Sequence, residues 1–308
     1  MILIGGENIM DMIQTGIQND NMLFESVPGG SPYNVALAIG RQKTKVGYIT
    51  PISQDKNGDR LFTRLVQSNV EVLSERVGAP TSLAIVNFKN GGPSYVFYRN
   101  KTAERLVKVD QLKKHLKKNI KIFHIGSLGL IGGTDAESWE DLAKLCVKRG
   151  IKISLDPNVR ASLISDPDSY RSRIKRFMKI TDILKLSDED LNWLYEGQTE
   201  EASLSEILAV TSAKIIVLTR GKNGCSIWHD NNWYDHPAQT VAELKDTVGA
   251  GDTFMASLLV GISQNQYDNK LDTLDIAQKK ALLVYASKAA SLNCEQRGCN
   301  PPWAKDLV

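Results

Sequence analysis

The chain has 308 residues, of which 42% are hydrophobic, and its formal net charge at pH 7 is +3. This size and apolar content can bury the core of one large α/β domain or of two smaller ones. The small net charge, without a dense basic face, gives no reason to expect a nucleic-acid partner. The basic run at residues 113–118 is interpreted as the solvent-exposed side of a helix.

Cysteine spacing and the first residues indicate the compartment. The four cysteines match no zinc-binding spacing, so we expect reduced thiols. We find neither a signal peptide pattern at the N-terminus nor a run of about 18 apolar residues that would span a membrane. A cytoplasmic protein is expected.

The first predicted strand covers residues 1–5 and ends at a glycine pair. Glu7 and Asp11 follow it. Because α/β folds place ligands at the ends of strands, these carboxylates are candidates to bind hydroxyl groups. An exposed acidic loop is the alternative interpretation.

A second glycine pair, Gly29-Gly30, precedes a predicted helix that extends to about Arg41. Ser31 is expected to be its N-cap, with a proline in the first turn. Asn34 falls on that turn, and its carboxamide can both donate and accept hydrogen bonds. A strand at residues 45–50 and an amphipathic helix at residues 58–69 are expected next.

Two β-rich runs, residues 81–88 and 94–99, are separated by a turn signal at residues 89–93 and predict a hairpin. Strand alternation places Phe97 and Arg99 on one face and Tyr98 on the other.

From residue 121 onward, predicted strands and helices alternate, which favours an α/β fold with a parallel sheet and helices on both faces. The expected strands are 121–125, 152–155, 183–186 and 214–219, and the expected helices are 135–149, 169–179 and 274–293. Since parallel connections are right-handed, the carboxyl ends of the strands line one edge. Polar runs follow three of these strands, at residues 156–160, 187–190 and 219–224.

A loop rich in glycine, residues 246–252, opens one further predicted helix. Gly249 and Gly251 let the backbone approach an anion, and unpaired amide groups at a helix start stabilise its charge. Asp252 at this place suits a base that works beside a phosphate. Helix capping by Asp252 is the alternative.

Residues 246–252 and 29–36 resemble the two signatures of the PfkB, or ribokinase-like, family of carbohydrate kinases. The resemblance extends over nearly the whole chain. It implies one domain, residues 1–308, folded as a three-layer α/β sandwich with a small β lid at about residues 12–28 and 80–104. A lid would exclude water from phosphoryl transfer.

The resemblance also implies roles for individual residues. The catalytic residues would be Asp252, Gly249, Ala250 and Gly251. The sugar would contact Asp11, Gly29, Gly30, Asn34, Arg99 and Arg160. Arg160 could contact the phosphate instead of the sugar. Nucleotide binding would involve Thr219, Gly221, Gly224 and Lys185. The chain departs from the family's Asn-x-x-Glu motif, because Ser187 stands in the Asn position. The carboxylate for Mg²⁺ would then be Asp190 or Glu189. Asp246 and Thr247 would bind a monovalent cation.

The activity implied is transfer of the γ-phosphoryl group of ATP to a sugar hydroxyl, with Mg²⁺ and potassium as cofactors. Fructose is the expected substrate, because the segment from Glu7 to Asp11 and the run at residues 185–189 resemble fructokinases. The alternatives are 2-keto-3-deoxygluconate, another sugar of the family, or a non-catalytic sensor of sugar or nucleotide. A homodimer formed through the lid is expected, without nucleic-acid or membrane partners.

Overall fold

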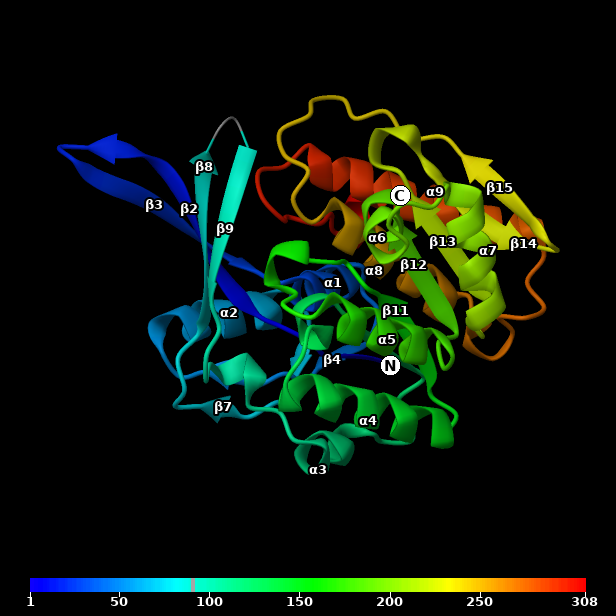
Figure 1. The fold of residues 1–308 in the computed structure, drawn as a ribbon, viewed down its shortest axis with the longest axis horizontal. Helices are drawn as coiled ribbons and strands as arrows, with labels where there is room; N and C mark the ends of the chain where they lie inside the picture. The colour runs from blue at the N-terminus through cyan, green and yellow to red at the C-terminus, as the bar shows by residue number, and fades with distance from the viewer. Residues whose placement is uncertain (90–91) are drawn as a thin grey trace.

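The computed structural model describes residues 1–89 and 92–308, and the side chains described are those outside residues 87–94. The predicted turn at residues 89–93 lies partly outside the described residues. A central nine-stranded sheet has the order β15-β14-β13-β12-β11-β10-β1-β4-β6 (Figure 1). All neighbouring strands from β6 to β13 are parallel, and β14 and β15 complete the sheet in antiparallel pairing. The bounds are β1 Ile2–Ile4, β4 Val46–Tyr48, β6 Glu71–Val72, β10 Ile122–Gly126, β11 Lys152–Asp156, β12 Ile183–Ser187, β13 Ile215–Thr219, β14 Cys225–His229 and β15 Asn232–His236.

Helices cover both faces of this sheet. Its parallel strands carry apolar side chains on both faces, and these side chains are buried only if helices pack against each face. Ile2 and Ile4 of β1 pack in one hydrophobic cluster, whereas Leu3 between them packs in the other. The first cluster includes helices α1 Ser31–Arg41, α2 Lys56–Gln67, α8 Ala250–Gln264 and α9 Ile276–Cys294. The second includes α3 Val109–Leu112, α4 Thr134–Lys148, α5 Pro167–Met178, α6 Asp188–Leu194 and α7 Glu200–Val210. The predicted three-layer fold is confirmed.

A separate four-stranded sheet, in the order β3-β2-β8-β9, projects from the main body (Figure 1). Its strands are β2 Ile9–Gln18, β3 Asn21–Gly29, β8 Ser82–Lys89 and β9 Gly92–Tyr98, and a two-stranded sheet joins β5 Ile52–Ser53 to β7 Arg76–Val77. Phe97 packs with buried Ile9, whereas Tyr98 is 60% exposed, as strand alternation predicts. We refer to this four-stranded sheet as the lid.

Two local predictions are wrong. Helix α1 has Gly30 as its N-cap, and no side chain caps it; Ser31 is the first residue of the helix, and its hydroxyl donates to Asp252. The basic run does not lie on a helix: α3 ends at Leu112, and residues 113–115 form a 3₁₀ turn. Only Leu116 within residues 113–118 is buried, which is too little apolar surface to hold a helix against the core.

None of the helices in the described part of the chain is long and apolar enough to cross a membrane.

Candidate active site at the start of α8

Helix α8 begins at a backbone conformation that requires glycine. Gly249 is its N-cap, with a left-handed φ of 76°. A Cβ atom at Gly249 would lie 2.4 Å from the Cys299 sulfur, so a larger residue would displace the C-terminal segment. The glycine that the sequence singled out therefore fixes both the turn and its packing.

Several amide groups at this helix start are available to a ligand. The Ala250 amide donates to the Thr247 carbonyl at 3.2 Å. The amides of Gly249, Gly251 and Asp252 find no acceptor within residues 1–89 and 92–308. Together with the positive end of the helix dipole, these amides form an anion site.

The Asp252 carboxylate is held by side chains from two distant segments. The Ser31 hydroxyl donates to Oδ1 at 2.7 Å, and the Asn34 amide donates to Oδ2 at 2.8 Å. The Asn158 amide is a third donor, at 3.3 Å from Oδ1. With only 7% of its surface exposed, Asp252 is oriented beside the anion site and shielded from bulk water.

Asn34 offers a further buried polar atom. Its Nδ2 atom is used by Asp252, but its Oδ1 atom has no hydrogen-bond partner in the described part of the chain. A buried carbonyl oxygen without a donor is costly unless a ligand or water supplies one. Asn34 is thus able to accept a hydrogen bond from a hydroxyl next to Asp252.

Asp11 lies on lid strand β2, not in the loop that follows β1. Its Oδ2 atom occupies the space in which a Cβ of Gly29 would sit, at 2.3 Å. Burial raises the pKa of Asp11 to about 6, although the Arg160 guanidinium opposes that shift. Arg160 itself is exposed and donates to the Asn158 carbonyl at 3.1 Å.

Glu7 lies beneath the second glycine pair and is almost fully buried. It accepts a hydrogen bond from the Ser31 amide at 2.9 Å. A Cβ at Gly30, whose φ is 109°, would lie 3.0 Å from the Glu7 carbonyl oxygen. Burial raises the pKa of Glu7 to about 7.

A buried ion pair lies under the anion site. Lys185 of β12 and Asp156 of β11 are 3.0 Å apart, and each side chain is less than 5% exposed. The Lys185 nitrogen is 3.5 Å from the position of a Cβ on Gly251. Burial raises the pKa of Asp156 to about 6, while the charge of Lys185 limits the increase. The Lys185 ammonium of this pair places a positive charge next to the anion site.

Arg99 is held in a bidentate ion pair that sequence reasoning did not anticipate. Its Nε and Nη2 atoms donate to the two oxygens of Glu104 at 2.9 and 3.1 Å. Glu104 is buried and also accepts from the Ser82 hydroxyl at 2.8 Å. The geometry gives Arg99 a structural role at the end of β9.

The two candidate magnesium ligands differ in their surroundings. Asp190 is buried, and its oxygens accept from the amides of Val159 at 2.6 Å and Ser187 at 2.9 Å. Glu189 is exposed. Among the residues described, no three His, Cys, Asp or Glu side chains gather to hold a metal ion. This donor set fits a Mg²⁺ ion held mainly by phosphates and water.

The predicted nucleotide loop lies between two antiparallel strands. Thr219 ends β13, and a 3₁₀ turn at Gly221–Asn223 leads through Gly224 into β14. A Cβ at Gly224, with φ of 89°, would lie 2.3 Å from the His236 carbonyl oxygen. The segment is the turn of a hairpin formed by β13 and β14.

The loop before α8 is fixed by Asp246. Its two oxygens accept from the amides of Val248 at 3.0 Å and Gly298 at 2.9 Å. The Thr247 carbonyl accepts from Ala250, as described above. Asp246 thus connects the anion site to the C-terminal segment.

Sequence reasoning missed two of the groups that surround Asp252. The sequence predicts Ser31 as the N-cap of α1 and gives Asn158 no role beyond its place in the polar run at residues 156–160. The sequence held one indication for each residue. Ser31 follows a glycine pair and Asn158 follows a strand end, and the fold brings both positions to the same edge of the sheet. Nothing in the sequence indicated the Glu104 pairing.

A mostly parallel sheet between two helical layers, with a β lid and a shielded carboxylate at a glycine-rich helix start, defines a ribokinase-like protein. The chain belongs to the pfkB family of carbohydrate kinases, whose family model matches residues 3–306.

Relatives and solved structures agree with this assignment. A fructokinase from Rhizobium leguminosarum bv. trifolii is 34% identical over 278 residues, covering 90% of this chain and 83% of the relative. The structure of a fructokinase with bound ATP from Xylella fastidiosa has a TM-score of 0.89 at 23% identity, covering 99% of this chain and 96% of that one. An aminoimidazole riboside kinase from Salmonella enterica, solved with aminoimidazole riboside and an ATP analog, has a TM-score of 0.86 at 20% identity, covering 99% and 98%. The same fold therefore occurs in kinases that are named for different substrates.

Proposed function

We propose that the chain is an ATP-dependent fructokinase. The observation that carries the proposal is the position of Asp252, a shielded carboxylate held by three donors at the anion site of α8. The choice of fructose is supported by relatives described as fructokinases, at 34% identity in Rhizobium leguminosarum bv. trifolii and 31% in Arabidopsis thaliana.

In the proposed mechanism, Asp252 accepts the proton of the attacking sugar hydroxyl. The new bond forms between that oxygen and the γ-phosphorus as the bond to the ADP oxygen breaks, and the electron pair leaves with ADP. The unpaired amides of Gly249 and Gly251 stabilise the charge on the transferring group. The Ala250 amide contributes less, because the Thr247 carbonyl already accepts its proton.

The sugar would lie between the lid and Asp252. Asn34 would accept a hydroxyl proton at its unpartnered Oδ1 atom, and Asp11 would bind a second hydroxyl from the lid. Gly29 and Gly30 would contact the sugar through their backbone, and the missing Cβ of Gly29 leaves room for the Asp11 carboxylate. Arg160 would contact the sugar or the phosphate. Arg99 would reach the sugar through Nη1, since its other two nitrogens bind Glu104.

The nucleotide phosphates would lie on the anion site, with Lys185 near them and the segment from Thr219 through Gly221 to Gly224 beside them. We propose that Asp190 and Glu189 hold Mg²⁺ through water molecules, because the Asp190 oxygens already accept two amides. A bound Mg²⁺ ion would neutralise phosphate charge. A potassium ion is proposed at the Asp246 and Thr247 loop.

A homodimer through the lid is also proposed. The lid carries large hydrophobic side chains that are at least 36% exposed, namely Ile17, Met22, Leu23, Phe24, Tyr95, Val96 and Tyr98. Apolar surface concentrated on one projecting sheet is typical of an interaction site. Sedimentation or gel filtration of the chain, compared with a Tyr98→Glu variant, tests this proposal.

A cytoplasmic location is proposed as well. All four cysteines are buried free thiols, which suits a reducing compartment.

The substrate that competes with fructose is 2-keto-3-deoxygluconate. Arg160 lies close enough to Asp11 to alter its pKa and is exposed, so its guanidinium could pair with a sugar-acid carboxylate. Only a direct comparison of the two substrates separates these alternatives.

ADP formation from MgATP, measured over a panel of fructose, 2-keto-3-deoxygluconate, ribose, tagatose, adenosine and glucose, tests the proposed function. Fructose should give the highest kcat/KM, and Asp252→Asn should reduce kcat about 10²- to 10⁴-fold while fructose still binds. Asp168→Asn, at a side chain that is 98% exposed, is the matched control and should retain activity. Near-normal turnover by Asp252→Asn would overturn the mechanism, and a higher kcat/KM for another sugar would overturn the choice of fructose.

A further inference from the structure

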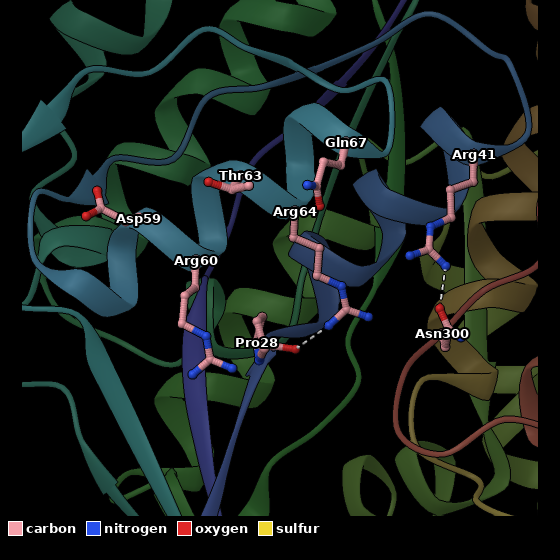
Figure 2. Close-up of a pocket in the computed structure, with 8 residues that line it drawn as sticks. All are labelled: Pro28, Arg41, Asp59, Arg60, Thr63, Arg64, Gln67 and Asn300. Carbon is pink, nitrogen blue, oxygen red and sulfur yellow. Dashed lines mark hydrogen bonds between the residues drawn. The ribbon is translucent and has the colours of Figure 1, made fainter.

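A pocket of about 580 Å³ lies away from the Asp252 site, between α2, the end of β3 and the C-terminal segment. None of its lining residues belongs to the active site described above. Figure 2 shows Arg60 and Arg64 reaching from α2 toward Pro28, while Arg41 at the end of α1 reaches toward Asn300. Three guanidinium groups thus share one pocket.

These three arginines are bonded to neutral groups. Arg41 donates to the Asn300 side chain at 2.6 Å and to the Pro301 carbonyl at 2.8 Å. Arg60 donates to the Ser26 carbonyl at 2.6 Å, and Arg64 donates to the Cys299 carbonyl.

Within residues 1–89 and 92–308, none of the three forms an ion pair with a carboxylate. The one acidic lining residue, Asp59, is 2.7 Å from Arg76. The charge of Asp59 is therefore shared with an arginine outside the pocket lining. The lining of the pocket therefore holds three guanidinium groups and one carboxylate, which is an excess of positive charge.

The surroundings of Arg41 disfavour its charged form. Burial lowers the pKa of Arg41, and the neighbouring Arg64 lowers it further. Arg41 also lies over the ring of Trp303, 5.1 Å from its centroid, which provides only weak compensation. An anion in the pocket would relieve the repulsion among the guanidinium groups.

We propose that this pocket binds the phosphate group of a small phosphate monoester. Guanidinium groups pair with phosphate oxygens through parallel hydrogen bonds, and several converging arginines suit a dianion. The volume exceeds that of a phosphate group alone and lies in the range of small-molecule sites. Thr63, Gln67 and Asn300 line the same pocket and provide neutral hydrogen-bonding groups for the organic part.

A ligand here would act on two parts of the active site. Arg60 and Arg64 hold the end of β3, which is a strand of the lid and ends at Gly29. Arg64 also holds Cys299, whose side chain packs against Gly249. A phosphate that draws these guanidinium groups away from their carbonyl partners would change the KM for the sugar. This effect on KM rests on the proposed function, whereas the binding itself does not.

Calorimetric titration with inorganic phosphate and glycerol 3-phosphate, with citrate for comparison, tests the binding. Two variants are compared with the unaltered chain. Arg60→Gln removes one guanidinium, and Thr63→Glu adds a carboxylate to the lining at a residue that forms none of the hydrogen bonds given above. Each should weaken phosphate binding at least tenfold. Lys148→Gln, an exposed cation at the end of α4, is the charge-matched control and should bind normally.

The results separate this proposal from the proposed function. If phosphate binds only at the start of α8, neither variant will change its affinity. That outcome would overturn the proposal that this pocket binds phosphate. Citrate binding as tight as glycerol 3-phosphate binding would overturn the preference for phosphate. Thermal unfolding of each variant verifies the fold. Binding lost in both folded variants supports the pocket even if no sugar in the panel is phosphorylated.

Discussion

The Ser31 hydroxyl donates a hydrogen bond of 2.7 Å to the Asp252 carboxylate, across 221 residues of sequence. This contact joins the start of α1 to the start of α8, so the two glycine-rich segments form one site. Ser31 is the first residue of α1, and Gly30 is its N-cap, so the Ser31 hydroxyl bonds to Asp252 and not to the amides of its own helix.

Ser31→Ala should reduce kcat while leaving the fold intact. Removing one hydrogen bond to a charged group costs about 1.5 kcal/mol, which corresponds to roughly a tenfold loss of kcat if that bond orients the base. Thr199→Ala is the reciprocal control, because Thr199 accepts from the Ala202 amide as a true N-cap of α7. It should lose about 1 kcal/mol of stability and keep its kcat. If Ser31→Ala lost stability and kept its kcat while Thr199→Ala lost kcat, Ser31 would not orient the Asp252 carboxylate.

Gly29→Ala should weaken sugar binding through Asp11. A Cβ at Gly29 would lie 2.3 Å from Asp11 Oδ2, and the carboxylate can yield by rotating away. We expect the KM for fructose to rise roughly tenfold, since one charged hydrogen bond would be lost, with little change in the unfolding midpoint. Gly16→Ala on strand β2, which also carries Asp11, is the control, because a Cβ there meets no atom within 4 Å. Equal KM values for both variants would show that Asp11 does not bind the sugar.

Lys185→Met should destabilise the fold by leaving Asp156 buried without its partner. The loss of one member of a buried ion pair costs about 3 kcal/mol in the free energy of unfolding. The double variant Asp156→Asn/Lys185→Met should recover most of that stability, as measured by urea unfolding. If Lys185 also binds nucleotide, the KM for ATP stays raised in the double variant. A double variant as unstable as the single one would show that the ion pair is not the cause.

The sequence predicts the inner parallel strands, from β4 to β13 in the sheet order, because each is a largely apolar run that is buried. It does not predict the edge strands β6 and β15, whose residues are exposed or only partly buried. Ile2, Leu3 and Ile4 are all fully buried, and such runs between helical patterns are hard to misread. The glycine-rich start of α8 was equally visible, because the left-handed φ of Gly249 is a local requirement of the turn.

The lid was harder to predict, for a physical reason. Strand β2 has no clean alternation: Ile9 and Met10 are both buried, and Asp11 and Met12 are both partly exposed. A sheet without covering helices imposes only a weak period of two, so the sequence places Asp11 after the end of the first strand and not within β2. Contacts such as Arg99 with Glu104 depend on how the chain turns after β9, which residue spacing does not specify.

Glu7 should make stability depend on pH. In the unfolded chain this carboxyl titrates near 4.5, and burial raises its pKa in the folded protein to about 7. Between these values the folded state binds a proton that the unfolded state has released, so the free energy of unfolding falls as pH rises from about 4.5 to about 7. The full effect is about 3 kcal/mol. Glu7→Gln, which mimics the protonated form and can still accept from the Ser31 amide, should match the unaltered chain at pH 4.5 and exceed its stability at pH 8. Urea unfolding at both pH values measures the difference, with exposed Glu189→Gln as the control. A stability gain that is equal at the two pH values would assign the effect to packing and not to the titration of Glu7.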